Sequence, residues 1–226
     1  MRKIVFLLLT LNVCLVVNAQ RIGLEGSYVG DILYQKEGGK SATDYVSGWN
    51  AGFMYEQFFV KERGAGKWSL ETGLLWEMRG GRYGIEWYQE ATTCTRFMHY
   101  VEVPLNVNRY FVLGKESWKL KAFAFGGPRL YVGTAGKYGN HYYLATRPYK
   151  RHNPYNDKFS GRYMHRFDAQ LGIGGGVEWH FVRLKVEYDF PLTNSSADGN
   201  PDYLYQHGLK VGLGLRLDLR RESEER

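Results

Sequence analysis

The stretch between Arg166 and Leu192 alternates apolar and polar residues almost without interruption. The apolar residues recur at every second position: Phe167, Ala169, Leu171, Ile173, Val177, Trp179 and Phe181, then Val182, Leu184, Val186, Tyr188 and Phe190. The positions between them are mostly charged or glycine, and the pattern reverses near residues 180–182. A side-chain period of two predicts two β-strands joined by a tight turn.

These two strands are long, and one face of each is apolar while the other carries charge or glycine. Strands of this kind are typical of a transmembrane barrel, in which the apolar face meets lipid and the polar face lines the lumen. The same alternation predicts strands at residues 21–34, 46–60, 67–79, 96–111, 117–132 and 206–219. The sequence therefore predicts an all-β chain: an eight-stranded antiparallel transmembrane β-barrel of the OmpA/OmpX-like architecture.

The predicted connections alternate in length. The short ones lie at residues 61–66, 113–116 and 180–182, and the long ones at residues 35–45, 80–95, 134–162 and 194–203. Short periplasmic turns and long outer loops are the pattern of outer-membrane barrels. Trp68, Trp118 and Trp179 then fall near the periplasmic rim, and Trp49 and Trp76 fall toward the outer one, as two aromatic girdles require.

A soluble, lipocalin-like barrel has the same periodicity with the faces reversed, so that the apolar residues point inward and the charges face water. The alternation alone does not separate the two assignments. The strand lengths and the asymmetry of the loops favour the membrane barrel.

The first residues have the pattern of an export signal. Arg2 and Lys3 precede an apolar run from Ile4 to Val17, and Val17-Asn18-Ala19 resembles a cleavage site. The apolar run is shorter than the ~20 residues of a spanning helix. We expect residues 1–19 to be a signal peptide cleaved after Ala19, and residues 20–226 to form one domain in the cell outer membrane. Cleavage leaves Cys94 as the single cysteine, so no intramolecular disulfide is expected.

Most ionisable strand residues fall on the predicted lumen face. An eight-stranded barrel is only wide enough for side chains to fill it, so these groups are expected to pair into a dry network. The alternatives are a narrow proton or ion path, or a carboxylate pair for acid–base chemistry. The expected network comprises Glu71, Glu102, Lys119, Lys121, Asp168, Glu178, Arg183, Lys185, Glu187, Asp189, Lys210 and Arg216.

No catalytic, metal or cofactor site is predicted. A G-x-S-x-G nucleophile motif is absent, and the six histidines show no ligand spacing. The run Gly174-Gly175-Gly176 precedes no helical pattern, so we interpret it as a device for sheet curvature and not as a phosphate loop. The protein is therefore not expected to be an enzyme.

The long segment at residues 134–162 is the candidate binding surface, because it mixes aromatic and basic residues that are favoured at interfaces. The formal net charge of +7 also suits anionic groups. We expect contact with outer membrane lipid and lipopolysaccharide, or with a protein partner, no nucleic-acid binding, and a monomer. The candidate residues are Tyr138, Tyr142, Tyr143, Arg147, Tyr149, Lys150, Arg151 and Tyr155.

Several motifs resemble a known family. They are Tyr100-Val101-Glu102-Val103-Pro104-Leu105, Ala124-Phe125-Gly126-Gly127-Pro128, Asp168 with Leu171-Gly172-Ile173-Gly174-Gly175-Gly176-Val177-Glu178, and Gly212-Leu213-Gly214-Leu215-Arg216. Together they are similar to the PorT-type outer membrane β-barrel domain, a group of small eight-stranded barrels. The resemblance implies the barrel fold and raises a role as an accessory part of a type IX-like secretion system. The leading expectation is a non-enzymatic barrel with a filled lumen, acting in envelope structure or presenting its loops to a partner; a narrow porin is the third possibility.

Overall fold

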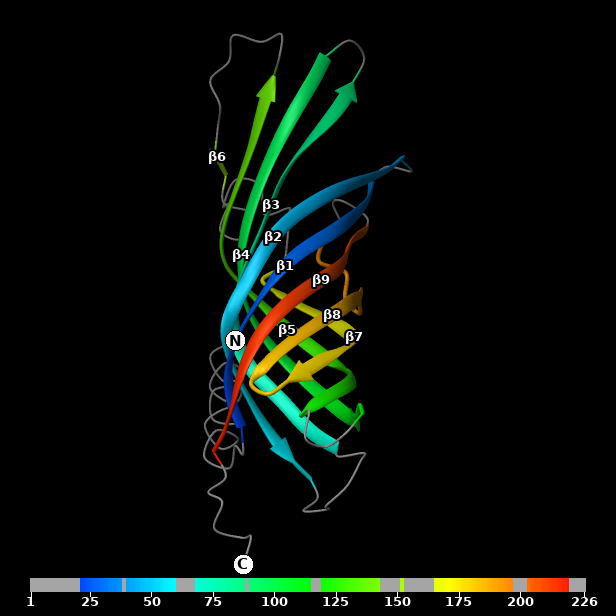
Figure 1. Ribbon diagram of the computed structural model, residues 1–226. Coiled ribbons are helices and arrows are strands. Elements are labelled where there is room, and N and C mark those ends of the chain that lie inside the picture. The colour runs from blue at the N-terminus through cyan, green and yellow to red at the C-terminus, as the bar shows by residue number, and fades with distance from the viewer. Residues whose placement is uncertain are drawn as a thin grey trace, which may run out of the picture.

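The chain folds into a closed antiparallel barrel (Figure 1). The computed structural model describes residues 21–37, 40–59, 68–87, 90–114, 119–142, 151–152, 165–196 and 203–219. Within these residues the regular elements are β1 (Arg21–Glu37), β2 (Lys40–Phe58), β3 (Trp68–Trp87), β4 (Glu90–Val112), β5 (Leu120–Tyr142), β6 (Arg151–His152), β7 (Phe167–Trp179), β8 (Val182–Pro191) and β9 (Tyr203–Asp218).

Eight of these strands form the ring. Their order is β4-β3-β2-β1-β9-β8-β7-β5, and β4 also pairs with β5, which closes the sheet on itself. The short strand β6 lies outside the ring and pairs with β5 at Tyr138 and Gly139. The prediction of an eight-stranded antiparallel barrel is confirmed. In the part of the chain that is described, no helix is long and apolar enough to cross a membrane.

The first and last strands meet along one seam. β1 pairs with β9 from Arg21 opposite Asp218 to Lys36 opposite Tyr203. The end of the barrel at which Arg21 and Asp218 lie also carries the connections β2–β3, β4–β5 and β7–β8, so we call it the turn end. We call the opposite end, where β3, β4 and β5 continue furthest, the extended end (Figure 1). The predicted signal peptide lies outside the described residues.

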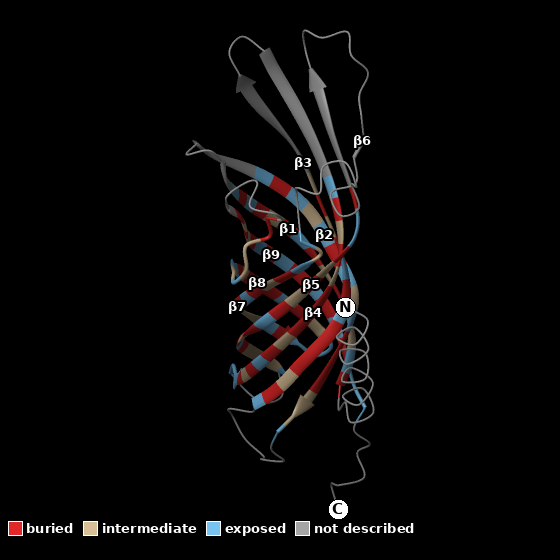
Figure 2. Ribbon diagram, turned by 180° about the vertical axis from the view of Figure 1, so that it is seen from behind, coloured by how far each residue is buried: buried red, intermediate tan, exposed pale blue. Residues whose placement is uncertain are grey.

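Apolar side chains cover the outside of the barrel and charged side chains fill the inside. Along β8, Arg183, Lys185 and Asp189 are buried, while Leu184 and Val186 between them are 48% and 49% exposed. Figure 2 shows the same alternation of buried and exposed positions along the other ring strands. The sidedness of a transmembrane barrel is thus confirmed, and the reversed, lipocalin-like assignment is wrong.

Exposed aromatic side chains gather toward both ends of the outer surface. Trp68 and Trp179 lie at the turn end, and Trp49 and Trp76 lie outward nearer the extended end. This arrangement matches the two predicted girdles. The fifth predicted member, Trp118, lies outside the described residues.

The strands are longer at the extended end than the alternation predicts, and two of the predicted long loops are wrong. β1 continues to Glu37 and β2 begins at Lys40, so residues 35–45 belong largely to a hairpin. Likewise β3 and β4 remain paired from Gly80 opposite Phe97 to Trp87 opposite Glu90. Apolar alternation stops where a strand leaves the bilayer, but the backbone ladder needs no apolar face to continue in water. The alternation therefore underestimates strand length at this end.

The predicted loop at residues 134–162 also begins as strand. β5 continues to Tyr142 and pairs with β4 as far as Thr92. Of the candidate binding residues, Tyr138 and Tyr142 belong to β5 and Arg151 to β6. The other five, which lie outside the described residues, are Tyr143, Arg147, Tyr149, Lys150 and Tyr155.

The glycines of β7 make room for aromatic rings inside the barrel. A Cβ atom at Gly174 would lie 2.6 Å from Cζ of Phe125, and one at Gly176 would lie 2.7 Å from Cζ of Phe123. Real Cβ atoms do not approach other atoms so closely, so larger residues would displace the rings or the neighbouring backbone. These glycines were predicted to allow curvature; the structure also gives them a packing role.

Candidate functional site: the charged barrel lumen

The inside of the barrel is a continuous network of charged groups. Seven basic and ten acidic side chains are buried among the described residues, so the cations must be shared between carboxylates. The basic residues are Arg21, Arg79, Arg129, Arg183, Lys185, Lys210 and Arg216. The acidic residues are Glu25, Asp31, Glu56, Glu71, Glu77, Glu102, Asp168, Glu178, Glu187 and Asp189.

Arg21 organises the turn end of the lumen. It donates to Glu178 at 2.8 Å and to Glu56 at 3.2 Å, and its Nε atom lies 2.8 Å from the exposed carboxylate of Asp218. The Tyr110 hydroxyl donates to Glu56 at 2.7 Å. Since Arg21 and Asp218 are opposite one another on β1 and β9, this cluster ties together the seam of the barrel.

The next layer toward the centre holds two arginines around two glutamates. Arg216 lies 2.6 Å from Glu25 and 3.2 Å from Glu71, and Arg183 also pairs with Glu71. The Arg183 guanidinium carbon lies 3.8 Å from the ring centroid of Phe123. A cation over an aromatic face is attracted by the ring quadrupole, and the attraction is stronger when both groups are out of water. The layer is thus filled by charge pairs and stacked rings together.

The centre of the lumen is built around Lys210 and Arg129. The Lys210 ammonium lies 3.0 Å from Glu77, 3.1 Å from Glu102 and 3.0 Å from Asp189. Arg129 lies 2.6 Å from Glu102, 2.5 Å from Glu187 and 2.9 Å from Asp189.

Tyr131 links the central layer to the next one. Its hydroxyl accepts a hydrogen bond from Lys210 at 2.8 Å and donates one to Asp189 at 3.1 Å. The Arg79 guanidinium also lies 5.0 Å from the Tyr131 ring centroid, and it pairs with Asp31 at 3.1 Å. The charge network therefore continues from the turn end into the half of the barrel nearer the extended end.

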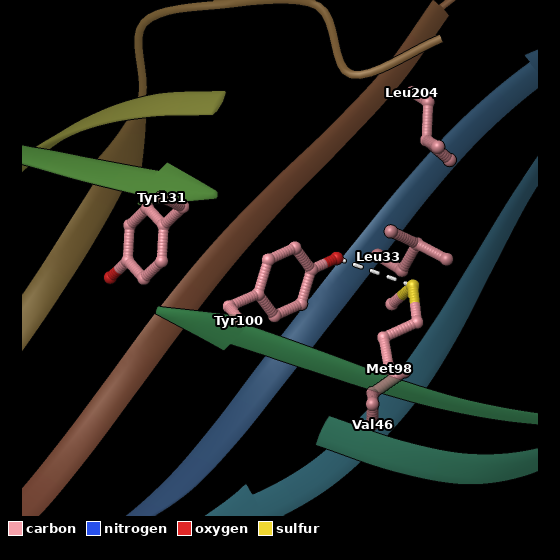
Figure 3. Packing of buried hydrophobic residues seen from close by; sticks show 6 residues of the cluster. All are labelled: Leu33, Val46, Met98, Tyr100, Tyr131 and Leu204. Atoms are coloured by element: carbon pink, nitrogen blue, oxygen red, sulfur yellow. Dashed lines mark hydrogen bonds between the residues drawn. The ribbon is translucent and has the colours of Figure 1, made fainter. Parts of the chain in front are cut away.

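Apolar side chains cap this network toward the extended end. The cluster consists of Leu33, Val46, Met98, Tyr100, Tyr131 and Leu204, all of which are buried (Figure 3). They come from β1, β2, β4, β5 and β9, and the Tyr100 hydroxyl donates to the Met98 sulfur at 3.2 Å. The two tyrosine rings meet edge to face with centroids 6.0 Å apart. A packed apolar cluster thus lies beyond the charged layers on the side of the lumen formed by β1, β2, β4, β5 and β9.

Nine of the twelve predicted network residues lie in ion pairs with other buried charges. Lys121 lies at its margin, because its side chain is 40% exposed and its ammonium is 3.7 Å from Glu178. Asp168 is buried, but its described partners are the amide of Gln170 and the hydroxyl of Thr193. The residues that join the network are Glu71, Glu102, Glu178, Arg183, Lys185, Glu187, Asp189, Lys210 and Arg216.

The prediction that Lys119 belongs to the network is wrong. Lys119 is exposed in the connection before β5 and has a positive φ of 50°, so it does not enter the lumen. Arg129 was missed, although it belongs to the centre of the network. The period of two did place Arg129 on the inward face, because residues at odd positions of β5 share the face of Lys121. The inward face of β5 was hard to recognise because Phe123 and Phe125 on it are apolar, while Ala122 and Ala124 on the outward face are small.

The arrangement is suited to filling and stabilising the barrel. Buried carboxylates that lie among cations and hydroxyl donors are compensated, which reduces the cost of their desolvation. Within the described residues, no group of three or more His, Cys, Asp or Glu side chains could hold a metal ion.

The family model for the outer membrane protein β-barrel domain matches residues 18–197. No curated protein sequence matches the chain.

Several solved structures are similar to this chain at low sequence identity, among them the following three. Ail, the attachment invasion locus protein of Yersinia pestis, solved with the heparin analogue sucrose octasulfate, is 13% identical with a TM-score of 0.36, covering 87% of this chain and 98% of Ail. Neisserial surface protein A is 10% identical with a TM-score of 0.37, covering 86% and 96% of the two chains. The N-terminal β-barrel domain of OprF from Pseudomonas aeruginosa is 11% identical with a TM-score of 0.30, covering 86% and 97%.

The match to the family model covers most of the chain, including seven of the eight ring strands that the structure shows. The outward apolar faces and inward charges of the strands are those of a barrel surrounded by lipid. The chain therefore belongs to the outer membrane protein β-barrel domain family.

Proposed function

We propose that the protein is a non-enzymatic, non-conducting outer membrane barrel that acts through its extracellular end. In this proposal the signal peptide is cleaved after Ala19, the mature chain begins at Gln20, and the turn end faces the periplasm. Short connections and both described chain ends at the turn end support this orientation. N-terminal sequencing of the protein from purified outer membranes is expected to begin at Gln20.

The filled lumen is the observation that carries the proposal. Side chains occupy it in successive layers, from Arg21 at the turn end through Lys210 at the centre to the apolar cap around Met98. An ion would have to break charge pairs and then pass the apolar cluster, and both steps are costly.

Conductance tests this property directly. The refolded protein, inserted into a planar lipid bilayer, is expected to give no stable unitary conductance, whereas a larger porin in the same bilayer gives one. A steady open level from the wild-type protein would contradict the proposal and would favour the narrow porin.

The extended end is the proposed binding surface. β3, β4 and β5 continue as one sheet past Gly80, and β6 adds to the β5 edge at Gly139 (Figure 1). The segment between β5 and β6 is rich in tyrosine and in basic residues, which supports contact with lipopolysaccharide phosphates or a protein partner.

Charge removal tests the candidate segment. Replacing Arg147, Lys150 and Arg151 together by Gln is expected to weaken binding of the monomeric barrel to lipopolysaccharide vesicles. The matched control is Lys119→Gln, which removes one exposed charge at the turn end. Equal binding by the triple variant and the wild type would remove this segment from the proposal.

A role in secretion is the second candidate. The motifs Tyr100–Leu105 and Leu171–Glu178 resemble the PorT-type domain, whose name comes from a component of the type IX secretion apparatus. Deletion of the gene, followed by measurement of exported cargo in the medium, tests it. Loss of cargo that the wild-type gene restores would favour the secretion role over envelope structure.

A further inference from the structure

Arg109 of β4 stands on the outside of the barrel. Among the strand positions whose side chains are described, it is the only Arg, Lys, Asp or Glu on the outward face. Its neighbours along that face are Val107 and Phe111, which are 41% and 43% exposed. A charge on the lipid face is costly near the bilayer midplane and inexpensive near the interface, so its depth decides what it can do.

The structure puts Arg109 close to the turn end. Its register partner on β3 is Trp68, the first residue of that strand, and β4 ends three positions later at Val112. The guanidinium carbon lies 4.8 Å from the Trp68 ring centroid and 5.6 Å from that of Phe111. Since Phe111 is two residues nearer the turn end, the guanidinium contacts a ring on the rim side of Arg109. This is the direction in which long basic side chains reach for the headgroup region.

The guanidinium is held in place but is not neutralised. Two exposed rings fix its position through cation–π contacts, and no carboxylate pairs with it among the described residues. An arginine presents a planar fork of N–H donors that fits two oxygens of a phosphate group.

The surface next to Arg109 is apolar toward the membrane centre. Val107 continues the β4 face, and Ala124 of β5, the register partner of Arg109, is small and exposed. A ligand that suits this place carries a phosphate at the rim and hydrocarbon above it.

From these contacts we infer that Arg109, Trp68 and Phe111 form a binding site for one phospholipid of the periplasmic leaflet. Arg109 binds the phosphate, and the lipid's acyl chains lie along Val107 and Ala124. The site depends on the barrel spanning the outer membrane with its turn end in the periplasm. It does not depend on what the extracellular end binds or on whether the lumen conducts.

Native mass spectrometry of the refolded barrel tests the site. The wild type, Arg109→Gln and the control Lys119→Gln are each titrated with phosphatidylglycerol in a neutral detergent. One basic residue near a membrane surface contributes about a fivefold difference in binding. The wild type and Lys119→Gln are expected to retain one bound lipid with equal affinity, and Arg109→Gln to bind about fivefold more weakly. All three must show the same heat-dependent shift in electrophoretic mobility, which verifies folding.

Two further ligands separate the contribution of the phosphate from that of the hydrocarbon. Diacylglycerol, which lacks the phosphate, is expected to bind the wild type no better than it binds Arg109→Gln. Inorganic phosphate is expected to leave the bound phosphatidylglycerol in place, because it lacks the hydrocarbon. Equal retention of phosphatidylglycerol by the wild type and Arg109→Gln overturns the inference. An equal loss in Arg109→Gln and Lys119→Gln also overturns it, because it would indicate general attraction to the basic rim.

Discussion

Replacing Lys210 by Met removes the central cation of the lumen while keeping a side chain of similar length. The ammonium is fully buried and lies within 3.1 Å of three carboxylates, those of Glu77, Glu102 and Asp189. Glu77 keeps its ion pair with Arg79, and Glu102 and Asp189 keep their contacts with Arg129, so the loss is partial. Removing one partner of a buried ion pair costs ~3–5 kcal/mol, and we expect the lower end, about 3 kcal/mol.

Urea unfolding in lipid vesicles, followed by tryptophan fluorescence, measures this loss. With a slope of about 2 kcal/mol per molar urea, the midpoint is expected to fall by about 1.5 M. The matched control is Lys121→Met, because Lys121 is 40% exposed and 3.7 Å from Glu178, and its loss should cost less than about 1 kcal/mol. Adding Glu77→Gln to Lys210→Met should recover part of the stability, since it removes one of the three carboxylates that lose the Lys210 charge. Equal midpoints for the two single variants would refute the view that these carboxylates depend on Lys210.

Two other substitutions test packing and sidedness in the same unfolding assay. Gly174→Ala is expected to cost about 1–3 kcal/mol because the new Cβ would clash with the Val186 carbonyl oxygen and lie 2.6 Å from Phe125, whereas Gly26→Ala, with its nearest atom at 3.5 Å, should stay within about 0.5 kcal/mol. Leu213→Arg, on the exposed outer face midway along β9, should cost about 2–4 kcal/mol, and Leu219→Arg at the turn end about 0–1 kcal/mol. Equal losses within either pair would contradict the corresponding argument.

The alternation of residue types was sufficient to predict the eight strands and most of the network. β8 is the clearest case, because Arg183, Lys185 and Asp189 alternate with apolar residues and all three are buried in the lumen. The prediction failed where the alternation carries less information. Lys119 lies in a connection, where no period applies, and β5 has apolar residues on both faces around Phe123.

The sequence by itself determined which face of each strand meets lipid, because a period of two assigns every side chain to one side or the other. It did not determine which inward residues share a level of the lumen. Closure of the sheet between β4 and β5, and between β1 and β9, brings Arg129 to Glu102 and Lys210 to Glu77. Those pairings depend on how far neighbouring strands are offset around the ring, which is a property of the closed barrel and not of any one strand. For the same reason, only the folded structure shows that Arg109 lies against Trp68 at the rim.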